Sequence, residues 1–174
     1  ALPLKSMKKW MPCLHWAGAW REGCRMLEKY QSLCEERQKI IVSHDRASKN
    51  PAKHVAENPA RHLVCQYCLD DKTILGDNAS CCDYLVLNCE QKLAYFIELK
   101  GGHVREAKRQ FACAETLVAD DIEGFARFYR IVYRSNTHDV QSNEMVAWKK
   151  KAGSYRGIPV VVVKSMLLKE RITF

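Results

Sequence analysis

Apolar and polar positions are most regular in the middle of this chain, where two apolar segments flank a short polar break. The segments cover 82–89 and 92–100 and are rich in Val, Ile, Leu, Tyr and Phe. Glu90 and Gln91 separate them. Two strand-length apolar runs around so short a break predict a β-hairpin. Both faces of the hairpin are apolar over most of its length, so we expect it to lie in the centre of a sheet.

The hairpin register predicts a group of three charged side chains at its open end. A turn at Glu90 and Gln91 would place Asp83 directly opposite Glu98. Directly opposed residues share a face, with Cβ atoms about 4.5–5.5 Å apart. Lys100 follows two positions after Glu98 and points to the same face, because side chains alternate along a strand. Charges at the end of a buried strand are candidates for a functional site.

Two carboxylates so close together repel each other unless a cation lies between them. Oxygen ligands suit a divalent cation such as Mg²⁺ or Mn²⁺, and the backbone carbonyl of Leu99 is a further candidate ligand. Lys100 would orient or deprotonate a water, or stabilise the charge that develops on a phosphate under attack. The competing interpretation is a strand cap at Asp83 beside an ordinary, solvent-exposed ion pair between Glu98 and Lys100.

These residues resemble the signature of the PD-(D/E)XK nuclease superfamily. Asp83 is followed by fourteen residues and then by Glu98-Leu99-Lys100, at the end of a predicted strand and before a predicted helix. Cys-Asp-Tyr-Leu and Phe-Ile-Glu-Leu-Lys-Gly are similar to a group of small, mostly uncharacterised bacterial members, over roughly residues 60–118. Cys82 stands where the family has proline.

The resemblance implies a fold and roles for individual residues. We expect one domain over 1–174 with a restriction-endonuclease-like α/β core, in which helices flank a mixed central sheet. Asp83 and Glu98 would be metal ligands, and Lys100 would be the catalytic lysine. Several members add a glutamate from a helix to the metal site. The candidates here are Glu22, Glu28, Glu35 and Glu36.

The helix predicted after the hairpin, over 103–119, carries an apolar stripe and a basic face. Arg105, Lys108 and Arg109 form that face, for which nucleic-acid phosphates are the candidate partner and plain solvent exposure is the alternative. In the family this helix packs beside the active strand. Gln110 then falls where a polar accessory residue reaches the site.

Weaker patterns predict the remaining elements. We expect a basic arm over 1–12, one or two helices over 14–42, a loop over 43–59, strands over 62–69, 73–75, 125–134 and 158–163, and a short helix over 144–151. No apolar run approaches the roughly 20 residues needed to span a bilayer. No secretory signal is visible, which favours a cytoplasmic location.

Nine cysteines admit two interpretations. Cys65, Cys68, Cys81 and Cys82 would supply four thiolates for Zn²⁺ in an adaptor protein. Against zinc, strand alternation points the members of each pair to opposite faces. The odd count and the lack of a secretory signal favour reduced cysteines in a cytosol.

The formal charge of +8, from 28 Lys and Arg against 20 Asp and Glu, favours a polyanionic partner. Together these observations predict a Mg²⁺- or Mn²⁺-dependent nuclease, an endonuclease or exonuclease that hydrolyses phosphodiester bonds in DNA. A homodimer would suit cleavage of both strands of a duplex. The alternative is a catalytically silent protein of the same fold that binds nucleic acid or a protein partner.

Overall fold

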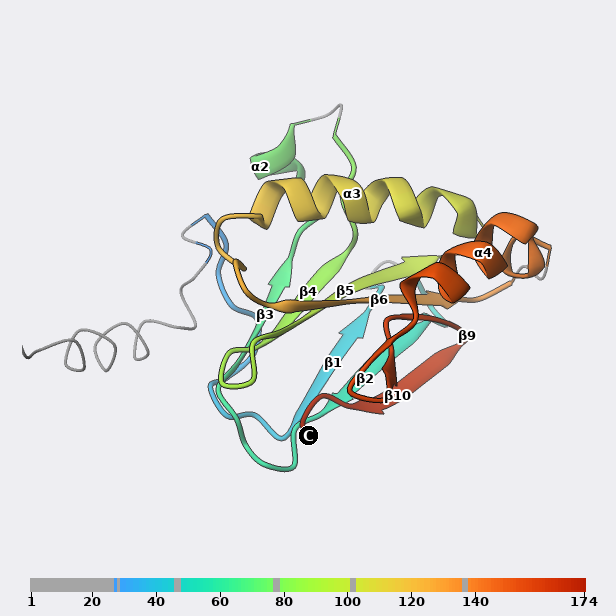
Figure 1. The fold of residues 1–174 in the computed structure, drawn as a ribbon. Coiled ribbons are helices and arrows are strands. Elements are labelled where there is room, and N and C mark those ends of the chain that lie inside the picture. The colour runs from blue at the N-terminus through green and yellow to red at the C-terminus, as the bar shows by residue number, and fades with distance from the viewer. Residues whose placement is uncertain (1–26, 28, 46–47, 77–78, 101–102, 136–137) are drawn as a thin grey trace, which may run out of the picture.

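The protein has a mixed α/β fold, seen in a computed structural model (Figure 1). The structure describes residues 27, 29–45, 48–76, 79–100, 103–135 and 138–174. The predicted basic arm over 1–12 and the first part of the one or two helices predicted over 14–42 lie outside these residues, as do Glu22 and Glu28. None of the described helices is long and apolar enough to cross a membrane.

A five-stranded mixed sheet forms the centre of the molecule. Its strands, in spatial order, are β3 (Val64–Cys68), β4 (Tyr84–Asn88), β5 (Leu93–Lys100), β6 (Ala126–Tyr133) and β9 (Val161–Ser165). The first three are antiparallel, and β6 and β9 continue parallel to β5. Buried side chains line nearly all of β4 and β5, as expected for central strands. The predicted hairpin, its register and its central position are confirmed, since Tyr84 pairs with Ile97.

A second, three-stranded sheet contains β1 (Ile40–His44), β2 (Lys53–Glu57) and β10 (Leu167–Arg171). The predictions of helix up to residue 42 and of a loop over 43–59 are therefore wrong. Buried and exposed positions alternate along β1, which is a strand period. Its partner β2 pairs in turn with β10, far away in the sequence, so local patterns could not reveal the sheet.

Two longer helices are α3 (Ala107–Val118), which follows the 3₁₀ turn η2 (Val104–Glu106), and α4 (Asn143–Ala152), which follows η3 (Asp139–Gln141). They confirm the helices predicted over 103–119 and 144–151. A predicted strand over 73–75 is instead the short helix α2 (Lys72–Leu75). Asp71 explains the difference, because its carboxylate caps α2 by accepting the Thr73 N–H at 2.9 Å.

The strand predicted over 158–163 is divided between two sheets. Its first part is β8 (Ile158–Pro159), which pairs with β7 (Ser154–Tyr155) in a two-stranded ribbon. Its second part begins β9. The predicted strands over 62–69 and 125–134 are confirmed as β3 and β6.

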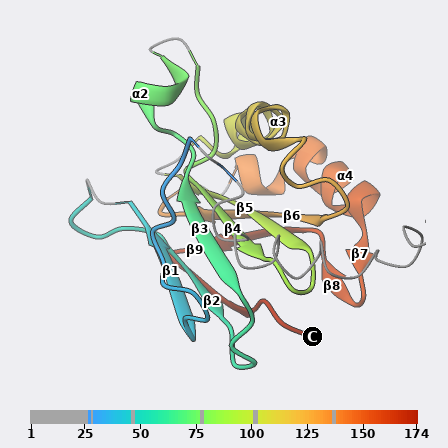
Figure 2. The ribbon, with the colours of Figure 1, turned by 90° about the vertical axis from the view of Figure 1, so that its left-hand side faces the viewer.

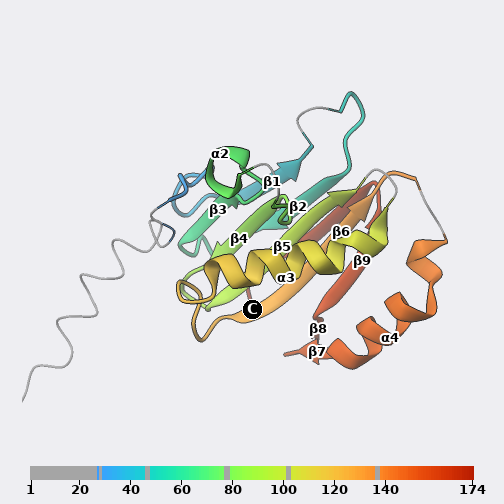
Figure 3. The ribbon, with the colours of Figure 1, turned by 90° about the horizontal axis from the view of Figure 1, so that it is seen from above.

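The elements form three layers (Figure 2). Helix α3 runs over the middle of the five-stranded sheet and α4 lies toward its β9 edge (Figure 3). The three-stranded sheet covers the opposite face, so the mixed central sheet is confirmed but described helices flank it on one side only. Leu85 and Phe96 pack under α3 against Phe111, while Val86 and Tyr95 pack toward the three-stranded sheet.

Candidate active site

The open end of the β4–β5 hairpin brings the two predicted acids together. The Asp83 carbonyl accepts the Leu69 N–H at 2.9 Å, which continues the ladder between β3 and β4. Asp83 Oδ2 accepts the Leu99 N–H at 2.7 Å. Reciprocally, the backbone of Asp83 donates a hydrogen bond to the Glu98 carboxylate. The predicted juxtaposition of Asp83 and Glu98 is confirmed.

Lys100 joins the two acids on the same side of the sheet. Its Nζ lies 2.9 Å from Glu98 Oε1 and 3.8 Å from Oε2 of Glu106, on the turn that precedes α3. The side chains of Glu98 and Lys100 are only 3% and 13% exposed. An ordinary solvent-exposed ion pair is therefore excluded. The contact with Glu106 was not predicted, because no sequence spacing ties η2 to the strand end.

Burial shapes the acidity of both carboxyl groups. It raises the pKa of Asp83 to about 6, although the Leu99 N–H and Lys100 act in the opposite direction. Burial, reinforced by the negative charge of Asp83, raises the pKa of Glu98 to about 8. The short contact with Lys100 favours an ionised Glu98 and so lowers its pKa, but the loss of hydration is the larger effect and keeps the pKa above its ordinary value.

One oxygen of the site lacks a partner. Glu98 Oε2 is buried and has no hydrogen-bond partner among the described residues. Leaving such an acceptor unsatisfied is costly, by about 1–3 kcal/mol. Two close carboxyl groups with raised pKa values and an unpartnered oxygen fit a divalent cation, which would replace their protons and their missing hydrogen bond.

Within the described part of the chain, no three His, Cys, Asp or Glu side chains group closely enough to hold a metal ion. Asp83 and Glu98 would thus be the acidic ligands, without Glu35 or Glu36. Two carboxylates are sufficient for Mg²⁺, which commonly completes its shell with waters and substrate phosphates. The Leu99 carbonyl stays a predicted ligand; the Leu99 side chain packs in the core on the opposite face of the sheet.

Gln110 lies on α3 and contacts the segment that leads into Asp83. Its Nε2 is 3.1 Å from Ser80 Oγ and 3.4 Å from the Cys81 carbonyl oxygen. Its Oε1 is buried without a partner among the described residues. Gln110 therefore fixes the backbone segment that precedes Asp83. Its accessory role at the site remains a prediction.

The cysteines differ from both interpretations of the sequence. Cys81 forms a disulfide with Cys113 of α3, and Cys65 Sγ lies 3.9 Å from Cys89 Sγ. A four-thiolate zinc site is therefore wrong, because Cys81 is already bonded. The expectation of reduced cysteines is wrong for this pair, whose connectivity no spacing could reveal. Disulfides are uncommon in a reducing cytosol; the cytoplasmic location stays a prediction.

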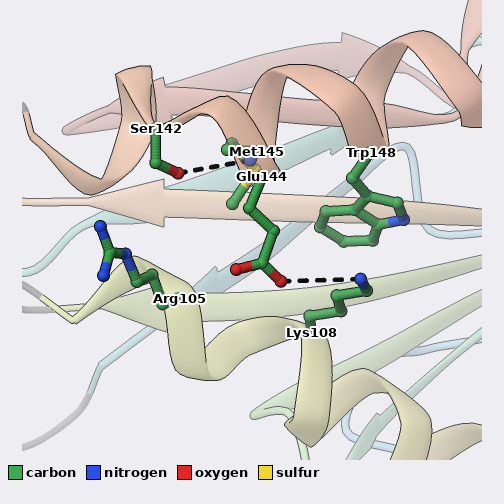
Figure 4. Close-up of a pocket in the computed structure, with 6 residues that line it drawn as sticks. All are labelled: Arg105, Lys108, Ser142, Glu144, Met145 and Trp148. Carbon is green, nitrogen blue, oxygen red and sulfur yellow. Dashed lines mark hydrogen bonds and ion pairs between the residues drawn. The ribbon is translucent and has the colours of Figure 1, made fainter.

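The three basic residues predicted to contact phosphates, on and before α3, differ in their ion pairs. Arg105 Nε pairs with Asp139 Oδ1 at 3.1 Å, and Lys108 Nζ pairs with Glu144 Oε1 at 3.7 Å. These cations line a small pocket between α3 and α4 (Figure 4). Arg109 is exposed and forms no ion pair with another described residue. Phosphate binding by these three residues stays a prediction.

No family model, curated protein or solved structure matches this chain. The function of this protein is therefore inferred from the geometry of the site. That geometry consists of two buried acids from adjacent strands, one amine beside them and one unpartnered oxygen.

Proposed function

We propose that this protein is a Mg²⁺- or Mn²⁺-dependent nuclease that hydrolyses phosphodiester bonds, with DNA as its substrate. The observation that carries the proposal is the pairing of Asp83 and Glu98 at the end of a buried hairpin, with raised pKa values and the Lys100 amine 2.9 Å from Glu98. Perturbed acids of this kind gather at functional sites.

The order of elements supports the resemblance to the PD-(D/E)XK superfamily. The antiparallel run β3, β4 and β5 is followed by α3 and then by β6, which is parallel to β5. The resemblance implies the order helix, strand, hairpin, helix, strand and strand, and the described elements agree with it from the first of these strands onward, with the short helix α2 inserted before the hairpin. The acids lie at the hairpin end from which the chain enters the helix, as the superfamily signature requires.

Each residue would have a distinct task. Asp83 and Glu98 would hold the cation through their oxygens in the deprotonated form, so cation binding would release any proton that Glu98 still carries. A bound divalent cation polarises a phosphoryl oxygen and lowers the pKa of water. Lys100 Nζ would orient the attacking water or stabilise negative charge on the phosphate. Its contact with Glu98 fixes the amine beside the reacting groups.

The test is a cleavage assay on labelled single-stranded, duplex and branched DNA, and on RNA, with Mg²⁺ or Mn²⁺ and with EDTA. We expect cleavage that requires the cation and is lost in Glu98→Gln. Glu57→Gln is the matched control, because Glu57 forms an exposed ion pair with Lys169 on the other sheet. Cleavage that persists in EDTA, or in the Glu98 variant, would contradict the proposal.

A catalytically silent binding protein is the second candidate, favoured by the net charge of +8. It predicts salt-dependent DNA binding without cleavage in the same assay. Cleavage of both strands of a duplex would favour a homodimer, and light scattering of the DNA complex would detect it.

A further inference from the structure

Two links hold the segment before Asp83 against helix α3. One is the covalent bond between Cys81 and Cys113. The other is the side chain of Gln110, which donates toward Ser80 Oγ at 3.1 Å and toward the Cys81 carbonyl at 3.4 Å. Gln110 and Cys113 are three residues apart on the helix and therefore lie on the same side of it. We call the disulfide and the Gln110 contacts together the α3 clamp.

The α3 clamp ends two residues before Asp83, at the point where the backbone geometry of the candidate cation site is set. Asp83 Oδ2 accepts from Leu99 at 2.7 Å, and the Asp83 backbone hydrogen-bonds to the Glu98 carboxylate. Both interactions depend on the path of the chain from Cys81 to Asp83. A change in that path alters the separation of the two acids.

Access to the disulfide is asymmetric. Cys81 is fully buried, whereas Cys113 is partly exposed on α3. A reducing thiolate therefore reaches the Cys113 sulfur first. The thiol of Cys82, next in sequence, is fully buried, so it is a poor competitor in exchange.

We propose that the Cys81–Cys113 disulfide is a redox-controlled positioning element for Asp83, and that its reduction weakens cation binding at the site. This inference rests on the proposed function. In the reduced protein Gln110 is the remaining link of the clamp. Losing an outer-shell contact of this kind lowers metal affinity by roughly 10- to 100-fold.

The redox step requires a dithiol reductant. Its thiolate attacks the Cys113 sulfur, the Cys81–Cys113 bond breaks, and a mixed disulfide forms at Cys113 while the Cys81 sulfur leaves and takes up a proton. The second thiol of the reductant then displaces Cys113. In total two electrons and two protons pass to the protein, which gains two thiols, and the reductant becomes a disulfide.

The test compares the oxidised full chain with the same chain reduced by dithiothreitol and then desalted without oxygen. Mn²⁺ alone is titrated into each form by calorimetry. We expect an affinity at least tenfold lower in the reduced form. Cys113→Ala should bind as weakly as the reduced protein in both preparations. Cys34→Ser is the control, since Cys34 lies outside the site near β3, and it should respond to reduction as the native chain does.

A readout specific to positioning is the amide resonance of Leu99, followed by NMR, because this N–H donates to Asp83 Oδ2 at 2.7 Å. Reduction should shift that resonance as the segment before Asp83 loosens. A merely structural disulfide would lower global stability and leave the Leu99 amide unchanged.

The outcomes separate the two proposals. Equal Mn²⁺ affinity in the oxidised and reduced forms would overturn the redox control and leave the cation site intact. Absence of Mn²⁺ binding in both forms would overturn the cation site itself, and the redox control with it. The reduced native chain needs no substitution, so the comparison holds even if Cys113→Ala does not fold.

Discussion

The two faces of the five-stranded sheet each bury an ionic cluster, and the two clusters are opposite in kind. On the helix-covered face lies the acid site, formed by Asp83, Glu98 and Lys100. On the other face lies what we call the arginine cluster, in which Glu170 Oε1 is 2.6 Å from Arg130 Nε and 2.7 Å from Nε2 of His54. One cluster has an excess of acid, and the other surrounds a single acid with basic groups.

The pKa values of the two glutamates show the consequence. Burial alone raises both, and in Glu98 it prevails with the help of Asp83, giving a pKa of about 8. In Glu170 the hydrogen bond from His54 and the attraction of Arg130 outweigh burial, so its pKa is lowered. The neighbouring charges therefore decide the direction of the pKa shift: a second acid beside Glu98 leaves it raised, and basic partners around Glu170 lower it.

The arginine cluster is a structural link. Arg130 is fully buried in β6, and its Nη1 donates to the carbonyls of Pro159 and Val160 at 3.1 and 3.0 Å. Its guanidinium also lies 5.3 Å from the ring centres of Tyr95 and Phe128. Because Glu170 belongs to β10, the pair ties the two sheets together. The acid site lacks this balance of charge, because two carboxyl groups lie beside one amine. We therefore assign the function to the acid site.

The largest expected effect is on cleavage. Lys100→Ala should reduce the rate by about 100- to 10,000-fold, as expected for loss of a group that acts in proton transfer or charge stabilisation. Single-turnover cleavage with saturating Mn²⁺ measures it. Lys39→Ala is the matched control, an exposed lysine just before β1, and should retain full activity. Undiminished cleavage by the Lys100 variant would remove this residue from the mechanism.

The same substitution should have opposite effects on stability in the two clusters. Glu170→Gln leaves Arg130 buried without its counter-ion and should lower the free energy of unfolding by about 3–5 kcal/mol. Glu98→Gln replaces an acid that burial disfavours, and at pH 8 without metal it should raise that free energy by on the order of 2 kcal/mol. Urea unfolding of both variants measures this. Changes of the same sign would contradict the contrast between the clusters.

The stability of the metal-free protein should fall as pH rises from about 5 to 8. Asp83 and Glu98 have folded-state pKa values near 6 and 8, above those of the unfolded chain, so the folded state binds more protons in this window. Each such proton contributes about 1.4 kcal/mol per pH unit. Denaturant midpoints across the range test it, and a slope unchanged in Glu98→Gln would show that another group titrates.

The smallest expected effects concern DNA affinity. Arg109 has no ion pair with another described residue, whereas Lys108 pairs with Glu144. Arg109→Ala should therefore reduce the salt dependence of DNA binding by about one released counterion, and Lys108→Ala by less. Fluorescence anisotropy at several salt concentrations distinguishes them. Equal slopes for both variants would show that the ion pair opens on binding.

Local patterns were sufficient for the acid site and insufficient for the arginine cluster. Asp83, Glu98 and Lys100 lie on one hairpin, so the turn position alone fixes their register. Arg130 and Glu170 meet only because two sheets pack face to face, and no local period predicts such packing. The strand β2 and the disulfide partner of Cys81 were missed for the same reason, since both depend on contacts distant in sequence.

The most direct test is a crystal structure of the oxidised protein soaked in Mn²⁺, with anomalous diffraction locating the ion. We predict one strong peak within about 2.0–2.4 Å of carboxylate oxygens from both Asp83 and Glu98, and none at the arginine cluster. Diffraction that places no Mn²⁺ between these two acids, at a concentration and pH where both are ionised, would contradict the account.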